Sequence, residues 1–420
     1  MDIKVQIHNF KRLIKNNSVI LENYFFMTIL QILNSFFYLL IYPYLIRVLG
    51  TENYGLFVFA TSISTYFSFF VNFGFDLPAT KAIAENPEKK DFLEDTLSSV
   101  FSAKLYLFSL ATILFIALLL CIPFFRENVK LFVYCYLIIF SSLIFPQWFF
   151  QGIQNMRVVT YIQLLFKIVS LPLIFIFVKK PNDLEIYAFI VTLSSIVGGI
   201  VAYSLIIFKY KLKIRLIHFN KLKIWFNEGM PFFLSNSAGI IKEQSITIII
   251  GVFFGMKDVA VYDLANKLIL IPRTLFMSIN AAIFPKLIRG ITKQKVKRII
   301  KLESLMSISV VVAITLFGKF AVVLLGGESM LTAYPLAILL SVTVITWLVV
   351  GAYISFVFIP AGKYFLATKN QLVALLSFGL YLSLGLLIFN SIYSFAAAIA
   401  LSGLTEILYC KYVTKKYELL

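Results

Sequence analysis

Positively charged side chains lie inside long apolar segments of this sequence, and their chemistry is the first guide to function. Lys242, Lys267 and Arg273 fall within two such segments, 229–253 and 258–285. A charge is costly in an apolar environment, so it is retained where it lines a wet cavity or pairs with another group. Ammonium and guanidinium groups bind phosphate and carboxylate oxygens. These cations therefore predict a site for an anionic ligand.

The second of these segments has its polar residues in a helical pattern. Asn266, Arg273 and Asn280 are spaced by seven, a separation that places them close to one stripe of a helix. Asp263 and Lys267 are four apart, which is the spacing at which opposite charges pair on a helix. We interpret this stripe as one wall of a hydrated cavity inside a helical bundle.

Further polar side chains in the other apolar segments complete the predicted cavity. We expect cations and amides to contact the ligand, and three carboxylates to couple the protein to H+ or Na+. The predicted ligand-binding residues are Lys242, Lys267, Arg273, Lys167, Asn236, Asn266, Asn280, Asn34 and Asn72, and the predicted ion-coupling residues are Asp76, Asp263 and Glu243.

A purely structural interpretation of the same charges stays open. Asp263 could pair with Lys267, and Lys242 could pair with Glu243 or with another neighbour, so that the charges hold helices together without touching a ligand. The cations Lys242, Lys267 and Arg273 outnumber the two carboxylates Asp263 and Glu243. This excess favours a cavity with net positive charge.

The elements that hold these side chains must cross a membrane. Hydrophobic residues make up 60% of the chain, against about 45–50% in soluble domains, and the mean hydropathy is +0.91. A membrane span needs about 20 apolar residues and must be helical. Lys104 and Lys319 lie near span ends, where we expect them to reach the interface. The predicted spans are 24–48, 54–78, 102–124, 131–152, 159–178, 185–208, 229–253, 258–285, 303–325, 334–357, 370–389 and 392–410.

Loop charges indicate how the chain crosses the membrane. With the N-terminus in the cytoplasm, cytoplasmic segments hold most of the lysines and arginines, as the positive-inside rule requires. We therefore expect an even number of spans and both termini in the cytoplasm. The basic linker 209–225 separates two predicted six-helix lobes, 1–208 and 226–420. Gly50 and Gly255 occupy equivalent turns at an offset of 205 residues, so the lobes are expected to be pseudo-symmetric.

Several classes of function are disfavoured by the sequence. The net charge of +18 is explained by topology signals and contacts with membrane lipids, so nucleic acid is not an expected partner. The three cysteines and two histidines have no metal-ligand spacing, and no phosphate-binding glycine-lysine loop is present. We expect no catalytic residues, no metal and no cofactor. A membrane enzyme ranks last, because the loops are short.

Five segments of the chain resemble Wzx-type O-antigen flippases in their order and spacing, and the similarity as a whole covers the chain from about residue 20 to residue 410. The Wzx-type flippases belong to the multidrug/oligosaccharidyl-lipid/polysaccharide (MOP) exporter superfamily. The segments are Gly50-Thr-Glu-Asn-Tyr-Gly55, Phe73-Gly-Phe-Asp-Leu-Pro-Ala-Thr-Lys81, Pro146-Gln-Trp-Phe-Phe-Gln-Gly152, Gly251-Val-Phe-Phe-Gly255 and Phe284-Pro-Lys286.

The resemblance implies an all-α, MATE-like fold with two six-helix lobes around a cationic central cavity. It implies translocation of undecaprenyl-pyrophosphate-linked oligosaccharide across the bacterial inner membrane by alternating access of the lobes. A polysaccharide polymerase and a chain-length regulator are the expected protein partners. The alternative is an ion-coupled exporter of drugs or other small amphiphiles with the same architecture.

Overall fold

The computed structural model of this protein describes residues 18–288 and 292–420, with side chains described except at 18–21, 24, 275, 277–288 and 364. Every regular element in these ranges is a helix. The first half contains α2 (Ser18–Asn72), α3 (Asp76–Glu85), α4 (Lys90–Cys121), α5 (Pro123–Glu127), α6 (Val129–Ile144), α7 (Gln147–Gly152), α8 (Met156–Phe177), η1 (Pro181–Asp183) and α9 (Leu184–Phe208). The second half contains η2 (Phe219–Leu222), α10 (Lys223–Phe253), α11 (Met256–Ile288), α12 (Lys293–Gly326), η3 (Glu328–Met330), α13 (Ala333–Tyr353), η4 (Ile354–Phe358), α14 (Tyr364–Ile388) and α15 (Tyr393–Lys416).

The all-α membrane fold predicted from the sequence is confirmed. Nine helices of the described ranges are long and apolar enough to cross a membrane. The long α2 counts once among them but contains two predicted spans, 24–48 and most of 54–78. The helices α10 and α11 are not among the nine, and these two helices carry Lys242, Asp263 and Arg273. The predicted number of twelve spans is therefore approximate.

Two glycine turns separate consecutive helices as the sequence predicts. Gly50 interrupts α2 with a φ of 80° and a ψ of 164°, and Gly255 separates α10 from α11 with a φ of 99°. A Cβ atom would meet no other atom within 4 Å at either position. Glycine is needed there for its backbone conformation, because other residues rarely adopt positive φ.

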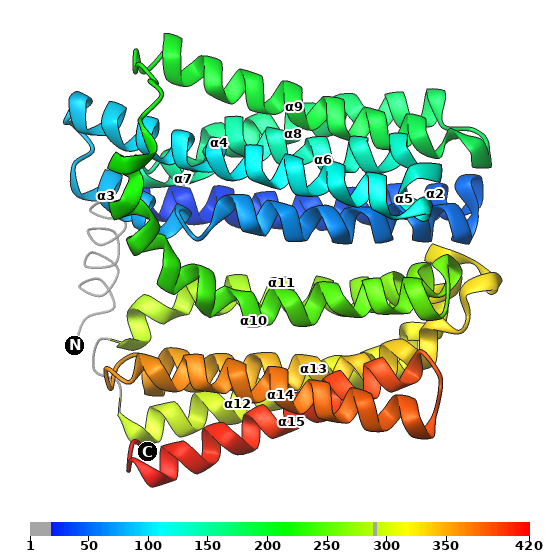
Figure 1. The fold of residues 1–420 in the computed structure, drawn as a ribbon. Coiled ribbons are helices and arrows are strands. Elements are labelled where there is room, and N and C mark those ends of the chain that lie inside the picture. Colours follow the sequence, from blue (N-terminus) through cyan, green and yellow to red (C-terminus); the bar gives the residue numbers. More distant parts are fainter. Residues whose placement is uncertain (1–17, 289–291) are drawn as a thin grey trace, which may run out of the picture. The chain divides into compact units, whose positions relative to one another are not determined.

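The chain forms two compact units, which we treat separately (Figure 1). The first unit comprises the segment that ends at Phe37, together with Phe67–Val178 and Glu185–Phe233. The second comprises Tyr38–Tyr66, Lys179–Leu184 and Leu234–Leu420. Both α2 and α10 contribute residues to each unit. The division into lobes 1–208 and 226–420 with a linker at 209–225 stays a prediction.

The core of the first unit is built from a motif that carried the family resemblance. Trp148, Phe149 and Phe150 of α7 are at most 5% exposed and pack with Phe75 and Ile83. A Cβ atom on Gly152 would lie 2.7 Å from the Ile83 side chain, so glycine allows α7 to lie against α3. This aromatic motif therefore contributes packing in the first unit.

Candidate functional site

A carboxylate bound by tyrosines lies in the second unit. The Asp263 carboxylate on α11 accepts hydrogen bonds from the hydroxyls of Tyr54, at 2.9 Å, and Tyr38, at 3.2 Å. The Lys267 ammonium lies 4.0 Å from the other Asp263 oxygen and 4.8 Å from the centroid of the Tyr38 ring. The predicted pairing of Asp263 with Lys267 is thus present, with a cation–π contact beside it.

A second polar cluster joins α10, α14 and α15. The Lys242 ammonium lies 3.3 Å from one oxygen of Glu406, and the Asn370 amide donates to the other oxygen at 3.2 Å. The Cys410 thiol donates to the Asn370 carbonyl at 3.5 Å. The side chains of Lys242 and Glu406 are 17% and 8% exposed. This cluster is a buried ion pair with hydrogen bonds to both ends of one amide.

A third ion pair, between α10 and α11, is more exposed to solvent. The Arg273 guanidinium lies 3.5 Å from Glu243, and the side chains of these residues are 24% and 57% exposed. Arg273 also lies 3.9 Å from the centroid of the Trp347 ring on α13, a geometry in which a planar guanidinium is attracted to the face of the ring. Arg273 thus contacts both the face of an aromatic ring and a carboxylate that stays accessible to solvent.

These three pairs correct the charge balance inferred from the sequence. Each of Lys242, Lys267 and Arg273 has a carboxylate partner, so the argument from an excess of cations is wrong. The missing carboxylate was Glu406, which is 164 residues from Lys242. Nothing local in the sequence connects the two residues, since helix pairing rules operate only at separations of three or four.

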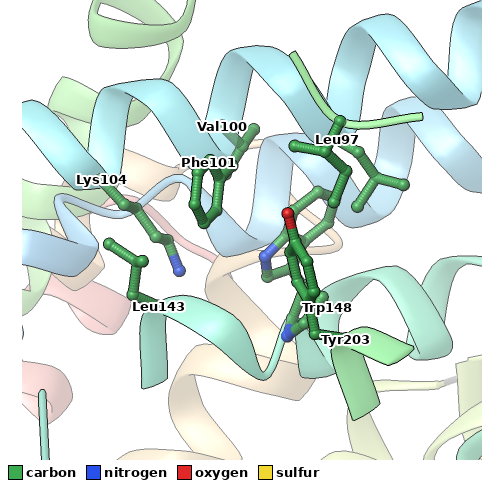
Figure 2. A pocket seen from close by; sticks show the side chains of 9 residues that line it. Leu97, Val100, Phe101, Lys104, Leu143, Trp148 and Tyr203 are labelled. Atoms are coloured by element: carbon green, nitrogen blue, oxygen red, sulfur yellow. The ribbon is translucent and has the colours of Figure 1, made fainter. Parts of the chain in front are cut away.

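The first unit contains a buried lysine near a small apolar cleft. The Lys104 side chain is 4% exposed and lies 2.7 Å from an Asp76 oxygen, and it donates to the Asn72 carbonyl at 2.8 Å. The expectation that Lys104 reaches the interface is therefore wrong, because two acceptors hold its ammonium inside. Figure 2 shows Lys104 in the wall of this cleft, with Trp148 and Tyr203 among the other lining residues.

Another predicted cation of the first unit has a neutral partner. The Lys167 ammonium on α8 donates a hydrogen bond to the Asn34 carbonyl on α2 and lies 6.0 Å from the centroid of the Phe37 ring. Among the residues that the structure describes, no carboxylate forms an ion pair with Lys167. Its positive charge is therefore not cancelled by a contact of the kind found in the second unit.

Three predicted asparagines are not placed in any of these clusters. Asn236 on α10 and Asn266 on α11 are exposed, and the side chain of Asn280 lies outside the described residues. In the described ranges, no group of three or more His, Cys, Asp or Glu side chains could hold a metal ion. The site residues with described contacts thus form two separate sets in the first unit, at Lys104 and at Lys167, and three ion pairs in the second.

Two curated bacterial proteins are similar in sequence. A protein of Escherichia coli strain K12 named "Putative O-antigen transporter" is 29% identical over 311 residues, which is 74% of each chain. A protein of Shigella dysenteriae with the same name is 25% identical over 258 residues, covering 60% of this chain and 64% of that protein.

Solved structures with the same fold cover almost the whole chain. An inward-facing MATE multidrug transporter of the MOP superfamily has a TM-score of 0.68 at 13% identity, covering 93% of this chain and 99% of its own. The lipid II flippase MurJ has a TM-score of 0.61 at 14% identity, covering 94% and 86%. Residues 20–291 match the family described as "Polysaccharide biosynthesis protein". Since this match spans more than half of the chain, the protein belongs to that family, within the MOP-type fold of the MATE and MurJ transporters.

Proposed function

We propose that this protein translocates undecaprenyl-pyrophosphate-linked oligosaccharides, such as O-antigen repeat units, across the bacterial inner membrane. The observation that carries the proposal is the family match over residues 20–291. The name of the Escherichia coli relative supports an O-antigen unit as the cargo. The paired charges inside α10 and α11 support a polar path through a bundle that is otherwise apolar.

Arg273 is our first choice for the contact with the pyrophosphate. Its carboxylate partner Glu243 is 57% exposed, so an incoming phosphate could replace that carboxylate while Glu243 turns into water. A guanidinium binds two phosphate oxygens at once, and the Trp347 ring at 3.9 Å holds it in place during the exchange. Lys242 is less suited, because its partner Glu406 is only 8% exposed.

Lys167 and Lys267 are the next candidates for anion contact. Lys167 has an amide partner, so an anion there needs to displace no carboxylate. The Lys267 side chain is 32% exposed and sits at 4.0 Å from Asp263, a distance beyond an ordinary charged hydrogen bond. The amides of Asn34, Asn72, Asn236, Asn266 and Asn280 are proposed to bind sugar hydroxyls.

Movement would follow alternating access of the two lobes, with coupling to H+ or Na+. Asp76, Asp263 and Glu243 are the proposed coupling groups. Each has a cation within 4.0 Å, so protonating the carboxylate or binding Na+ would weaken that pair and release the helix on which it stands. We propose an inner-membrane location with both termini in the cytoplasm, beside a polysaccharide polymerase and a chain-length regulator.

The test is a deletion strain complemented with single variants. We expect the deletion to abolish surface polysaccharide while lipid-linked oligosaccharide accumulates inside the cell, and we expect Arg273→Gln to fail to restore it. Lys257→Gln is the matched control, because it removes a cation from an exposed position of the same helix α11, and it should restore the polysaccharide. Drug hypersensitivity with normal polysaccharide would instead favour the exporter of small amphiphiles, whose fold this chain also shares.

A further inference from the structure

Residues 209–218, between α9 and α10, have no regular secondary structure, but hydrogen bonds hold their backbone in place. We call residues 209–218 the basic strap; Figure 1 shows it in green between these two helices. Blocks of like charge are usually disordered. Here the backbone is tied to α4 instead. The amide of Lys213 donates to a Glu94 oxygen at 3.1 Å, and that of Arg215 donates to the Ser98 hydroxyl at 3.0 Å.

The spacing of alternate residues in the strap matches the spacing of every fourth residue in α4. The amide of Ile217 donates to the Ser102 hydroxyl at 2.8 Å, so alternate residues of the strap meet every fourth residue of α4. Two residues of extended chain span about 6.6 Å, at about 3.3 Å per residue. Four residues of helix span about 6 Å, at about 1.5 Å per residue. The strap can therefore run along α4 with each second amide satisfied.

The side chains of residues 211–215 alternate between the core and the outside. Leu212 is 3% exposed, and Ile214 packs against the core of the first unit. The alternation ends there, because Leu216 is exposed and Ile217 packs against the core. The cations Lys211, Lys213 and Arg215 are exposed. Successive cations are two residues apart, so they stand in a row on the outer side of an immobilised chain.

The start of the strap is also fixed. The Tyr210 hydroxyl accepts a hydrogen bond from the Asn155 amide at 2.9 Å, and its ring lies 5.7 Å from that of Phe149. Partial burial raises the pKa of Tyr210, so the phenol stays neutral and keeps this contact. The row of cations is thus held at both ends before any ligand arrives.

The charge of this row is not cancelled by its surroundings. Residues 209–223 contain six lysines and arginines and no carboxylate. Among the described residues, Lys211, Lys213 and Arg215 form no ion pair. Glu94, a carboxylate that accepts a hydrogen bond from the strap backbone, already lies 3.8 Å from Lys90.

Exposed apolar side chains beside the row indicate what kind of surface it meets. Leu216 is 69% exposed, Phe219 is 54% exposed and Ile224 is 67% exposed. The strap follows directly after a candidate membrane span that ends at Phe208. Cations next to exposed apolar groups at a span end are typical of the membrane interface, where the apolar groups enter the lipid and the cations stay with the headgroups.

We propose that the basic strap is a binding site for the phosphate headgroups of anionic phospholipids. Lysines and arginines at the membrane surface attract such lipids, and a row fixed in advance loses little conformational freedom on binding. The site would hold lipid against the outer side of α4 whatever cargo the protein moves. It therefore stands independently of the proposed function.

The test uses the full-length protein purified in detergent and titrated with short-chain phosphatidylglycerol, with bound lipid counted by native mass spectrometry. The variant K211Q/K213Q/R215Q should bind more weakly by on the order of a hundredfold, because each surface cation contributes about fivefold. The matched control K297Q/R298Q/K301Q removes the same charge from exposed positions of α12 and should leave the affinity little changed. Short-chain phosphatidylcholine should not compete.

A variant that keeps the charges and a second ligand, farnesyl pyrophosphate, complete the test. The variant K211R/K213R/R215K keeps the row of charges and should retain the affinity, which separates loss of charge from loss of structure. Equal weakening in the α12 control would overturn the proposal. The proposal would also be overturned if the strap bound farnesyl pyrophosphate but not phosphatidylglycerol. The site would then serve the lipid-linked cargo.

Discussion

Substitutions in the buried pair of Lys242 and Glu406 can distinguish a structural role of Lys242 from a role in ligand binding. Breaking such a pair by removing one partner leaves an uncompensated buried charge, which destabilises a protein by about 3–5 kcal/mol. The two side chains are 17% and 8% exposed, so solvent screens this pair little. We expect Lys242→Met and Glu406→Gln each to lower the free energy of unfolding by that amount.

The double variant K242M/E406Q should be much less destabilised than the sum of the single variants. It removes both charges together and leaves mainly the weakened hydrogen bond to Asn370, which donates to Glu406 at 3.2 Å and is fully buried. That loss corresponds to about 1–3 kcal/mol. The coupling energy of the cycle should therefore be at least about 3 kcal/mol, at the upper end of what contacting residues show.

Unfolding of the purified protein by titration with SDS measures these free energies, and surface polysaccharide measures transport. If Lys242 acts only within the pair, the double variant recovers polysaccharide along with stability. Recovered stability without polysaccharide would show that Lys242 itself contacts the cargo, as the sequence first suggested. Strictly additive single effects would refute the reasoning, because the two side chains would then not depend on each other.

Two further substitutions test packing and hydrogen bonding in the second unit. Gly55→Ala should destabilise the protein by about 1–3 kcal/mol or more, because the new Cβ would lie 1.7 Å from the Met256 carbonyl oxygen. Thermal unfolding measures this effect. Gly239→Ala is the neutral control, because a Cβ there would meet no atom within 4 Å. Tyr54→Phe should destabilise by about 1.5–3 kcal/mol through loss of its bond to the Asp263 carboxylate, and an unchanged unfolding midpoint would contradict that assignment.

The sequence predicts correctly those features that depend on residues close together in the chain. Apolar length predicted the helices, and the special backbone freedom of glycine predicted the turns at Gly50 and Gly255. The spacing of four residues predicted the Asp263–Lys267 pair. Each of these inferences depends only on residues that are close together in the chain.

The charge partners that depend on tertiary structure could not be predicted in this way. The sequence offers Glu243 as a partner for Lys242, yet adjacent residues of a helix point in different directions. Glu243 instead meets Arg273 on the next helix, and Lys242 meets Glu406 near the end of the chain. Lys104 was judged by its position in a span, whereas the Asp76 carboxylate decides where its ammonium lies.

The three pairs of the second unit differ in how easily an anion could replace the carboxylate. The exposed fraction of that carboxylate side chain is 8% for Glu406, 12% for Asp263 and 57% for Glu243. A displaced carboxylate must be solvated elsewhere, which is costly in an apolar interior and cheap beside water. In the transport function proposed above, displacement of the carboxylate by an anionic cargo would therefore begin at Arg273. On this argument, glycan export should be most sensitive to charge removal at Arg273 and stability most sensitive at Lys242.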